Sequence, residues 1–308
     1  MTSNRLNTSR EEVLTAKRVV LKVGSSSLTG SAGSGLDTSA VDKLVDAVAI
    51  LKKRGVEVLV VSSGAIAAGL SPLGLTTRPK DLATQQAAAS VGQGLLIYRY
   101  TESFARHGIT ASQVLITSDD VVRRSHYRNA QRTFDRLLAL GVVPVINEND
   151  AVATEEIRFG DNDTLASLVA NLIEADLLII LTDQPGLFSE DPRKNKEAKL
   201  IHHGVAGDIS LEAMAGGAGS SIGTGGMLTK VLAAKRASRS GAHTIIASGK
   251  EENVLIRLSQ GETIGTHLES KQLKVAARKQ WLADHLQLRG KLILDDGAVD
   301  ALKKEGKS

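Results

Sequence analysis

Arg18-Val-Val-Leu-Lys-Val23 and Val56-Glu-Val-Leu-Val-Val61 are two short runs of β-forming residues, and the chain between them has the spacing of a helix. Within residues 36–54, apolar side chains recur every three or four positions, at Val41, Leu44, Val45, Val48 and Leu51. Asp37 is the expected N-cap of this helix and Gly55 its C′ residue. Because buried parallel strands are nearly continuous in apolar residues, this stretch predicts a β-α-β unit.

The same alternation continues along the chain. Further strands are predicted at residues 112–117, 142–146, 176–181 and 243–247. Further helices are predicted at residues 81–107, 125–140, 163–173 and 252–258, and from the end of a glycine run to about residue 240. Residues 185–201 contain two prolines and several basic residues, which predicts an exposed loop or hairpin. Strands that alternate with helices predict an α/β fold with a mostly parallel sheet covered on both faces.

The composition of the chain excludes several classes of protein. The chain has 308 residues, enough for one large domain, and no cysteine, which excludes disulfides, thiolate metal sites and cysteine nucleophiles. No apolar run approaches the roughly 18 residues that span a membrane. Residues 1–17 lack the apolar centre of a signal peptide, which favours a cytoplasmic location. A net charge of +4 with 3% aromatic residues argues against a base-stacking surface for nucleic acid.

Two segments are candidate phosphate sites. Lys22 ends an apolar strand, where an ammonium is costly unless it meets an anion, and Gly24 frees backbone N–H groups beside it. Residues 223–230 read Gly-Thr-Gly-Gly-Met-Leu-Thr-Lys and lead into a helix, whose N-terminus favours phosphate. The alternatives are a lysine that extends to solvent and a flexible linker. Thr182 and Asp183 follow another buried strand, which predicts a rim of the same crevice.

Carboxylates and amides gather in two further segments, Asn147-Glu-Asn-Asp150 and Gly160-Asp-Asn-Asp163, on either side of a predicted hairpin near residues 154–159. Such groups suit a ligand that carries an ammonium, or a magnesium nucleotide. The alternative is that Asp161 or Asn162 caps the next helix and the other side chains are solvated turn residues. Because both clusters occur, we favour a binding site.

Two common nucleotide motifs are absent from the sequence. Residues 223–230 do not fit a Walker A loop, and no Gly-x-Gly-x-x-Gly segment occurs. The histidines have no HExxH or other metal-ligand spacing. The sequence therefore disfavours the P-loop and dinucleotide-binding folds and a histidine metal site.

Six segments carry a resemblance to a known family. They are Val20-Leu-Lys-Val-Gly-Ser-Ser26, Val61-Ser-Ser-Gly-Ala-Ile-Ala-Ala-Gly69, Pro144-Val-Ile-Asn-Glu-Asn-Asp150, Phe159-Gly-Asp-Asn-Asp163, Leu181-Thr-Asp-Gln-Pro-Gly-Leu187 and Gly223-Thr-Gly-Gly-Met-Leu-Thr-Lys230. In order and spacing along about residues 18–265 they closely resemble the glutamate 5-kinase family of the amino acid kinase superfamily. The resemblance implies a three-layer αβα sandwich and phosphorylation of the γ-carboxylate of L-glutamate by ATP with Mg²⁺, the first step of proline biosynthesis. It further implies feedback inhibition by L-proline and a homo-oligomer.

The same resemblance implies roles for particular residues. Lys22 and Lys230 lie on the transferring phosphoryl group and Asp163 orients them. Residues that hold glutamate are Ser63, Gly64, Asp150 and Asn162. Residues that hold ATP are Lys22, Gly24, Thr182, Asp183, Thr224, Gly225, Gly226, Met227, Leu228, Thr229 and Lys230. No residue is assigned as a metal ligand.

The ends of the chain differ from its centre. Residues 1–16 match no known pattern and are expected to be a frayed N-terminal tail, and residues 17–270 form the expected kinase domain. Residues 271–308 are expected to be a connector and the beginning of a PUA-like domain that is cut short, with one strand candidate at 291–294. The alternative functions are another carboxylate or carbamate kinase of the superfamily, or a non-catalytic RNA-binding or regulatory protein.

Overall fold

One sheet organises the chain in this computed structural model, which describes residues 11–29, 35–117, 120, 124–152, 162–216 and 226–272. Among these residues, eight strands pair in the order β3-β4-β2-β1-β5-β7-β8-β6. The strands are β1 (Arg18–Val23), β2 (Glu57–Ser62), β3 (Ala111–Ile116), β4 (Val143–Glu148), β5 (Leu177–Thr182), β6 (His203–Val205), β7 (His243–Ser248) and β8 (Thr266–Glu269). All neighbours from β3 to β7 are parallel, as the alternation of elements predicts, and β8 runs antiparallel to β7.

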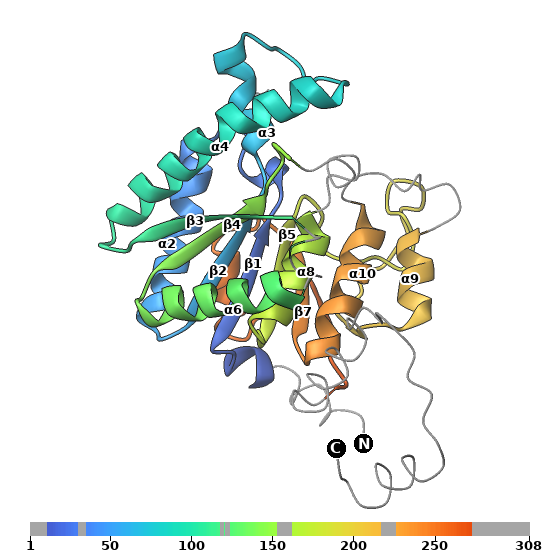
Figure 1. Cartoon of the computed structure of the whole chain (residues 1–308). Coiled ribbons are helices and arrows are strands. Elements are labelled where there is room, and N and C mark those ends of the chain that lie inside the picture. Colours follow the sequence, from blue (N-terminus) through green and yellow to red (C-terminus); the bar gives the residue numbers. More distant parts are fainter. Residues whose placement is uncertain are drawn as a thin grey trace, which may run out of the picture.

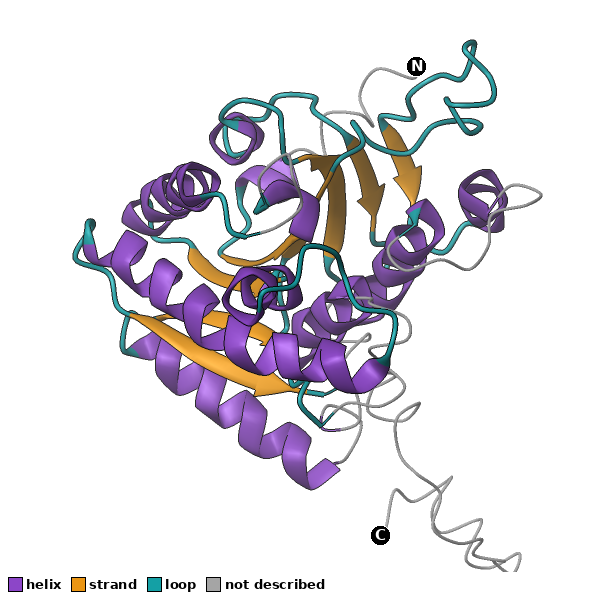
Figure 2. Ribbon diagram, turned by 90° about the horizontal axis from the view of Figure 1, so that it is seen from above, coloured by secondary structure: helices purple, strands orange, loops and turns teal. Residues whose placement is uncertain are grey.

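Helices cover both faces of the sheet, which gives the three-layer αβα arrangement (Figures 1 and 2). One face is covered by α6, α8 and α10, and the other by α2, α4 and α11. The helices are α2 (Thr38–Lys53), α3 (Ala65–Leu70), α4 (Leu82–Ala105), α6 (Arg124–Ala139), α8 (Asn162–Leu172), α9 (Ile209–Gly216), α10 (Met227–Ala237) and α11 (Val254–Leu258). Three short 3₁₀ turns, η1 (Ser25–Ser27), η2 (Ser71–Leu73) and η3 (Ser238–Ser240), follow β1, α3 and α10.

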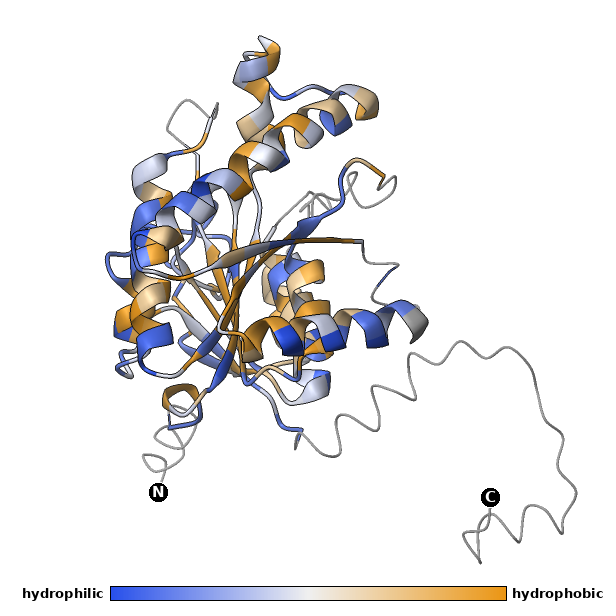
Figure 3. Ribbon diagram, turned by 60° about the vertical axis from the view of Figure 1, so that its left-hand side comes forward, coloured by the Kyte–Doolittle hydropathy of each residue, from blue (hydrophilic) through white to orange (hydrophobic). Residues whose placement is uncertain are grey.

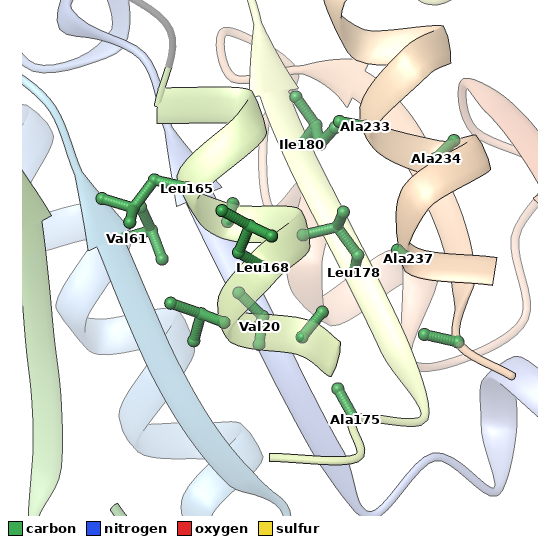
Figure 4. Packing of buried hydrophobic residues seen from close by; sticks show 14 of the residues in the cluster. Val20, Val61, Leu165, Leu168, Ala175, Leu178, Ile180, Ala233, Ala234 and Ala237 are labelled. Carbon is green, nitrogen blue, oxygen red and sulfur yellow. The ribbon is translucent and has the colours of Figure 1, made fainter. Parts of the chain in front are cut away.

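The core follows from the alternation of side chains along the strands. Val20 of β1 packs into the layer of α8 and α10, whereas its neighbour Leu21 packs into the layer of α2 and α4. Figure 4 shows Leu165 and Leu168 of α8 lying over the strands near Val20 and Val61. Burial of one such aliphatic side chain stabilises the fold by roughly 1.5–3 kcal/mol. Figure 3 shows the consequence, since the central strands are mostly hydrophobic and the helices carry hydrophilic residues on their outer sides.

The predicted helix ends agree with the observed caps. The Asp37 carboxylate accepts hydrogen bonds from the backbone N–H groups of Ser39 and Ala40 at the start of α2. Gly55 has a φ of +84°, the left-handed conformation that a C′ residue requires. Asp81 caps α4 through the N–H of Thr84 at 2.8 Å. These local signals therefore place the long elements to within a few residues.

Four short elements, α3, α9, β6 and β8, are not among the predicted ones. They contain 6, 8, 3 and 4 residues, which is too few to show a period. Tertiary contact holds α3 in place, because its Gly69 lies directly against α4. A Cβ at Gly69 would lie 1.9 Å from the carbonyl oxygen of Ala88. The basic segment 185–201 forms one antiparallel bridge, Phe188 with Leu200, within an otherwise irregular loop.

The described part of the N-terminal segment differs from the expected frayed tail. Residues 11–14 form a helical turn, and Val13 packs against the core cluster that includes side chains of α2 and α11. The Glu12 carboxylate lies 2.7 Å from Nε2 of His243, at the start of β7. Residues 1–10, the predicted hairpin at 154–159 and the expected strand at 291–294 lie outside the described residues. In the part of the chain that is described, no helix has both the length and the apolar character needed to cross a membrane.

Candidate active site

The carboxyl ends of four neighbouring strands bring the predicted site residues to one edge of the sheet. Val23, near the end of β1, is in register with Ser62 of β2 and Leu181 of β5. The segments that begin at Gly24, Ser63 and Thr182 therefore leave the sheet side by side. Ile146 of β4 pairs with Val61 of β2, which adds the segment that begins at Asn147. This is the edge at which parallel α/β sheets bind their ligands.

Lys22, Asp163 and Lys230 form a buried ionic triad at this edge. The Nζ atom of Lys22 lies 2.7 Å from Oδ1 of Asp163, and Nζ of Lys230 lies 3.1 Å from Oδ2. Asp163 is fully buried, and the two lysines are 6% and 3% exposed. Three residues far apart in the sequence thus meet, two cations on one shared carboxylate.

The Asp163 carboxylate remains ionised in this environment. Burial by itself raises the pKa of Asp163, but the charges of Lys22 and Lys230 and their hydrogen bonds outweigh burial, so the pKa lies below its ordinary value. Asp163 also occupies the first turn of α8, where the helix dipole favours a negative charge. The hydroxyl of Thr229 donates a further hydrogen bond to Oδ2 at 2.9 Å. The carboxylate is therefore held at both oxygens.

The preceding residue, Asn162, lies at the centre of a neutral amide network. Its Nδ2 carries two hydrogens and lies 3.2 Å from the backbone oxygen of Ser62, 2.9 Å from Oγ of Ser63 and 3.0 Å from Oδ1 of Asn147, so two of these acceptors share one hydrogen. Asn147 also accepts from the backbone N–H of Glu148 at 2.9 Å, which fixes its amide. We call Asn162, Asn147, Ser62 and Ser63 the amide network. It connects the start of α8 to the ends of β2 and β4.

Asp150 follows Asn147 by three residues, in the loop after β4. It is half-buried, and burial raises its pKa to about 6, while the positive charge of Arg78 lowers it in part. No hydrogen bond joins Asp150 to Asn162 or Ser63 within the described residues. Because the ionised form of such a buried carboxyl group is unfavourable by itself, a nearby cationic group of a ligand stabilises that form. Asp150 is therefore suited to an ammonium.

The end of β5 supplies the opposite rim. Thr182 is buried and donates its hydroxyl to Oδ1 of the exposed Asp183 at 3.1 Å, and its carbonyl accepts from the N–H of Gly249 at 2.7 Å. Neither Thr182 nor Asp183 shares a hydrogen bond with the ionic triad in the part of the chain that is described. A Cβ at Gly24 would lie 3.8 Å from Nζ of Lys22, so this glycine lines the approach to the lysine.

The glycine segment is described from Gly226 onward, and the predicted nucleotide residues Thr224 and Gly225 lie outside the described residues. Gly226 is the N-cap of α10 with an extended backbone, and Thr229 and Lys230 occupy the first turns. Met227 packs against the core. Its side chain is therefore structural, and only its backbone N–H is suited to an anion.

Three residues that complete this arrangement have no individually predicted role: Asn147, Ser62 and Tyr100, whose hydroxyl oxygen lies 3.0 Å from Oγ of Ser62. Asn147 carried a signal, because it is an amide at the end of an apolar strand within a polar cluster. Ser62 likewise is a polar residue that ends an apolar run. Tyr100 carried none, because an aromatic residue at helical spacing usually indicates core packing.

Comparison with known proteins places the chain among kinases. Residues 17–248 match the amino acid kinase family. The glutamate 5-kinase of Methylobacillus flagellatus is 57% identical over 296 residues, which cover 96% of this chain and 79% of that protein. The glutamate 5-kinase of Bordetella parapertussis is 59% identical over 293 residues, which cover 95% and 77%.

Solved structures with a similar fold are more distant in sequence. A carbamate kinase from Giardia lamblia bound to AMP-PNP superposes with a TM-score of 0.60 at 15% identity, over 83% of this chain and 99% of that chain. A UMP kinase from Bacillus anthracis superposes with a TM-score of 0.56 at 15% identity, over 83% and 97%. These similarities identify the αβα fold.

Proposed function

We infer that this chain, a member of the amino acid kinase family, phosphorylates the γ-carboxylate of L-glutamate with ATP. Within that family it belongs to the glutamate 5-kinases. In this reaction a carboxylate oxygen of glutamate bonds to the γ-phosphorus of ATP and the bond from that phosphorus to ADP breaks. The products are γ-glutamyl phosphate and ADP. The reaction is the first step of proline biosynthesis.

The observation that carries the residue assignment is the ionic triad. Phosphoryl transfer spreads negative charge over the equatorial oxygens of the moving group, and its catalysis is mainly alignment and neutralisation of that charge. Lys22 and Lys230 supply two ammonium groups at the ligand-binding edge, and Asp163 holds both at 2.7 and 3.1 Å. We propose that the two lysines contact the transferring phosphoryl group and that Asp163 orients them. An ionised carboxylate is already nucleophilic, so we assign no general base.

The amide network and Asp150 support the assignment of the acceptor side. The hydroxyl of Ser63 and the amide of Asn162 are held 2.9 Å apart and present polar groups of defined orientation. Together with Gly64 they are our proposed contacts for the glutamate chain. Asp150, whose raised pKa favours a cationic neighbour, is our proposed partner for the α-ammonium group.

ATP is assigned to the opposite rim. We propose that Gly24, Thr182, Asp183 and the segment 224–230 bind the nucleotide, supported by the helix N-terminus at Gly226. In the ranges that the structure describes, no group of three or more histidine, aspartate or glutamate side chains could hold a metal ion. Mg²⁺ is commonly bound by substrate phosphates, waters and one or two carboxylates. We propose that the phosphates of ATP would hold Mg²⁺ here, where it would neutralise phosphate charge.

Inhibition by L-proline, assembly into a homo-oligomer and a cytoplasmic location are further proposals. Inhibition by L-proline is proposed because the chain belongs to this family. Assembly into a homo-oligomer is supported by the surface of α4, which has no charged residue from 82 to 98 and exposes the apolar or aromatic side chains of Val91, Leu95 and Tyr98. We also propose a kinase domain over residues 17–270 and a PUA-like fragment over residues 271–308.

A coupled assay of ADP release tests the function. With ATP, Mg²⁺ and L-glutamate, ADP should appear at a rate that depends on glutamate, and hydroxylamine should trap the acyl phosphate as a hydroxamate. Parallel reactions with aspartate, N-acetylglutamate, carbamate and UMP test the other acceptors of the superfamily. The Lys230→Met variant, purified in the same way, reports contaminating ATPase activity. ADP release that is independent of L-glutamate, or that requires another acceptor, would overturn the assignment.

A further inference from the structure

A chain of buried hydroxyl groups leads from α4 to the amide network. The Oη atom of Tyr100 lies 3.0 Å from Oγ of Ser62, and Oγ of Ser62 donates to the backbone oxygen of Ser63 at 3.0 Å. Tyr100 and Ser62 are both fully buried. Because Ser62 has only one hydroxyl proton, which it gives to Ser63, Tyr100 must be the donor in the first bond. The chain therefore runs in one direction, from Tyr100 to Ser62 to Ser63.

The phenol of Tyr100 keeps its proton under all ordinary conditions. Burial raises the pKa of Tyr100 well above its usual value, and the hydrogen bond with Ser62 lowers it by less. The Tyr100 hydroxyl is thus protonated throughout the physiological pH range.

The residues at the end of this chain are those to which we assign the acceptor substrate. The backbone oxygen of Ser62 accepts from Nδ2 of Asn162 at 3.2 Å, and Oγ of Ser63 accepts from the same nitrogen at 2.9 Å. The bond from Ser62 to the Ser63 oxygen also fixes the peptide plane that leads into Gly64. That glycine has a φ of +108°, a conformation that only glycine adopts without strain. Small rotations of residues 62–64 would move the proposed contacts Ser63 and Gly64 together with the two oxygens that accept from Asn162.

We propose that Tyr100 is a positioning residue for the acceptor substrate, and that its hydroxyl orients residues 62–64 through Ser62. The proposal rests on the assignment of Ser63 and Asn162 to the acceptor under the proposed function. Tyr100 touches neither substrate, since it is fully buried in α4.

Packing alone does not account for this hydroxyl. The Tyr100 ring stacks on Phe104 with centroids 6.3 Å apart, and a phenylalanine would fill the same space. Burying a hydroxyl in an apolar core is unfavourable unless it forms a hydrogen bond. The bond to Ser62 is therefore the feature that distinguishes Tyr100 from an ordinary core aromatic residue.

Tyr100→Phe tests the proposal, and α4 supplies a matched control. Tyr98 lies two residues earlier, is 62% exposed and donates to Glu102 at 2.8 Å, so Tyr98→Phe removes the same atom from the same helix. Loss of one buried hydrogen bond predicts a roughly three- to tenfold rise in the KM for L-glutamate in Tyr100→Phe. The KM for ATP should stay within about twofold in both variants, because ATP is assigned to the opposite rim. Equal rises in both KM values, or a lower Tm with unchanged KM values, would make Tyr100 a purely structural residue.

Ser62→Ala gives the second measurement. If Tyr100 acts through Ser62, the double variant should raise the KM for L-glutamate no more than Ser62→Ala alone. If the KM of the double variant instead rises by the product of the two single effects, Tyr100 does not act through Ser62, and the proposal is overturned. If the wild-type enzyme phosphorylates a different acceptor, the proposed function fails, and the effect of Tyr100→Phe is then tested on the KM for that acceptor. If the wild-type enzyme phosphorylates no acceptor, both the proposed function and the role of Tyr100 are overturned.

Discussion

Asn162 and Asp163 are consecutive residues at the start of α8, yet their side chains belong to two different kinds of site. Asp163 holds two ammonium groups in the ionic triad, whereas Asn162 donates only to neutral oxygens in the amide network. The difference matches the two tasks of a kinase. Charge accelerates a step in which charge develops, and neutral hydrogen bonds position a substrate whose charge does not change there. Under the proposed assignment, one helical turn serves both substrates.

Asp163→Asn should have the largest effect, because it leaves two buried ammonium groups beside a neutral amide. Breaking a buried ion pair by removing one partner costs about 3–5 kcal/mol of stability. Turnover should fall as well, since neither lysine would be oriented. Urea unfolding and kcat measure the two effects, with the exposed Asp183→Asn as the control for stability. A variant as stable as wild type would show that the triad is not a compensated buried cluster.

Lys230→Met keeps an unbranched side chain of similar size and removes its ammonium group. The contact strengthens in the transition state, so kcat should fall by about 10²-fold or more while the KM for L-glutamate changes little. Lys235→Met, on the same helix, removes the surface pair with Glu212 and should leave kcat nearly unchanged. An unchanged kcat in the Lys230 variant would remove this lysine from the mechanism and weaken the division into two kinds of site.

Gly92→Ala disturbs the acceptor side through the backbone. A Cβ at Gly92 would lie 1.8 Å from the carbonyl oxygen of Ala65, so α3 must move away from α4, at a cost of roughly 1–3 kcal/mol. Because α3 directly follows Ser63 and Gly64, the KM for L-glutamate should rise more than the KM for ATP. Gly94→Ala meets no atom within 4 Å and should stabilise α4 by up to about 1 kcal/mol. The reverse ranking of the two variants would contradict the close helix contact.

Asp150→Asn should raise the KM for L-glutamate roughly tenfold near neutral pH, by removing a charge-assisted hydrogen bond. The pKa of Asp150 is about 6, so the wild-type KM should rise as the pH falls through that value, and the KM of the variant should not. A shared loss of affinity for ATP would place Asp150 elsewhere.

The raised pKa of Asp150 also predicts the sign of a change in stability. The folded protein binds a proton at Asp150 more readily than the unfolded chain, so ionisation of this group lowers stability as the pH rises towards about 6. Asp150→Asn should therefore be more stable than wild type above about pH 6. This advantage should shrink at lower pH, where the wild-type carboxyl is also neutral.

Most of the long elements could be predicted because their signals are local. The apolar run of β1, the helical spacing of α2 and the capping residue Asp37 need no information from the rest of the chain. The short strands β6 and β8, at one side of the sheet, contain 3 and 4 residues, which is too few for a local pattern to identify them. The same limit applies to α3, whose position depends on the approach of Gly69 and Gly92 to neighbouring backbone.

For the site, the sequence predicts which residue types follow the apolar strands, and it shows the polar clusters at Asn147 and Asn162. It does not predict which of these side chains contact one another. Whether Asp163 meets Lys22, Lys230 or both depends on the order β2-β1-β5-β7 and on where α8 and α10 lie over it. The link from Tyr100 to Ser62 is of the same kind, since the two residues are 38 positions apart and a core tyrosine has no signature. Periodicity and capping act between near neighbours, whereas these contacts arise only when packing brings distant backbone segments together.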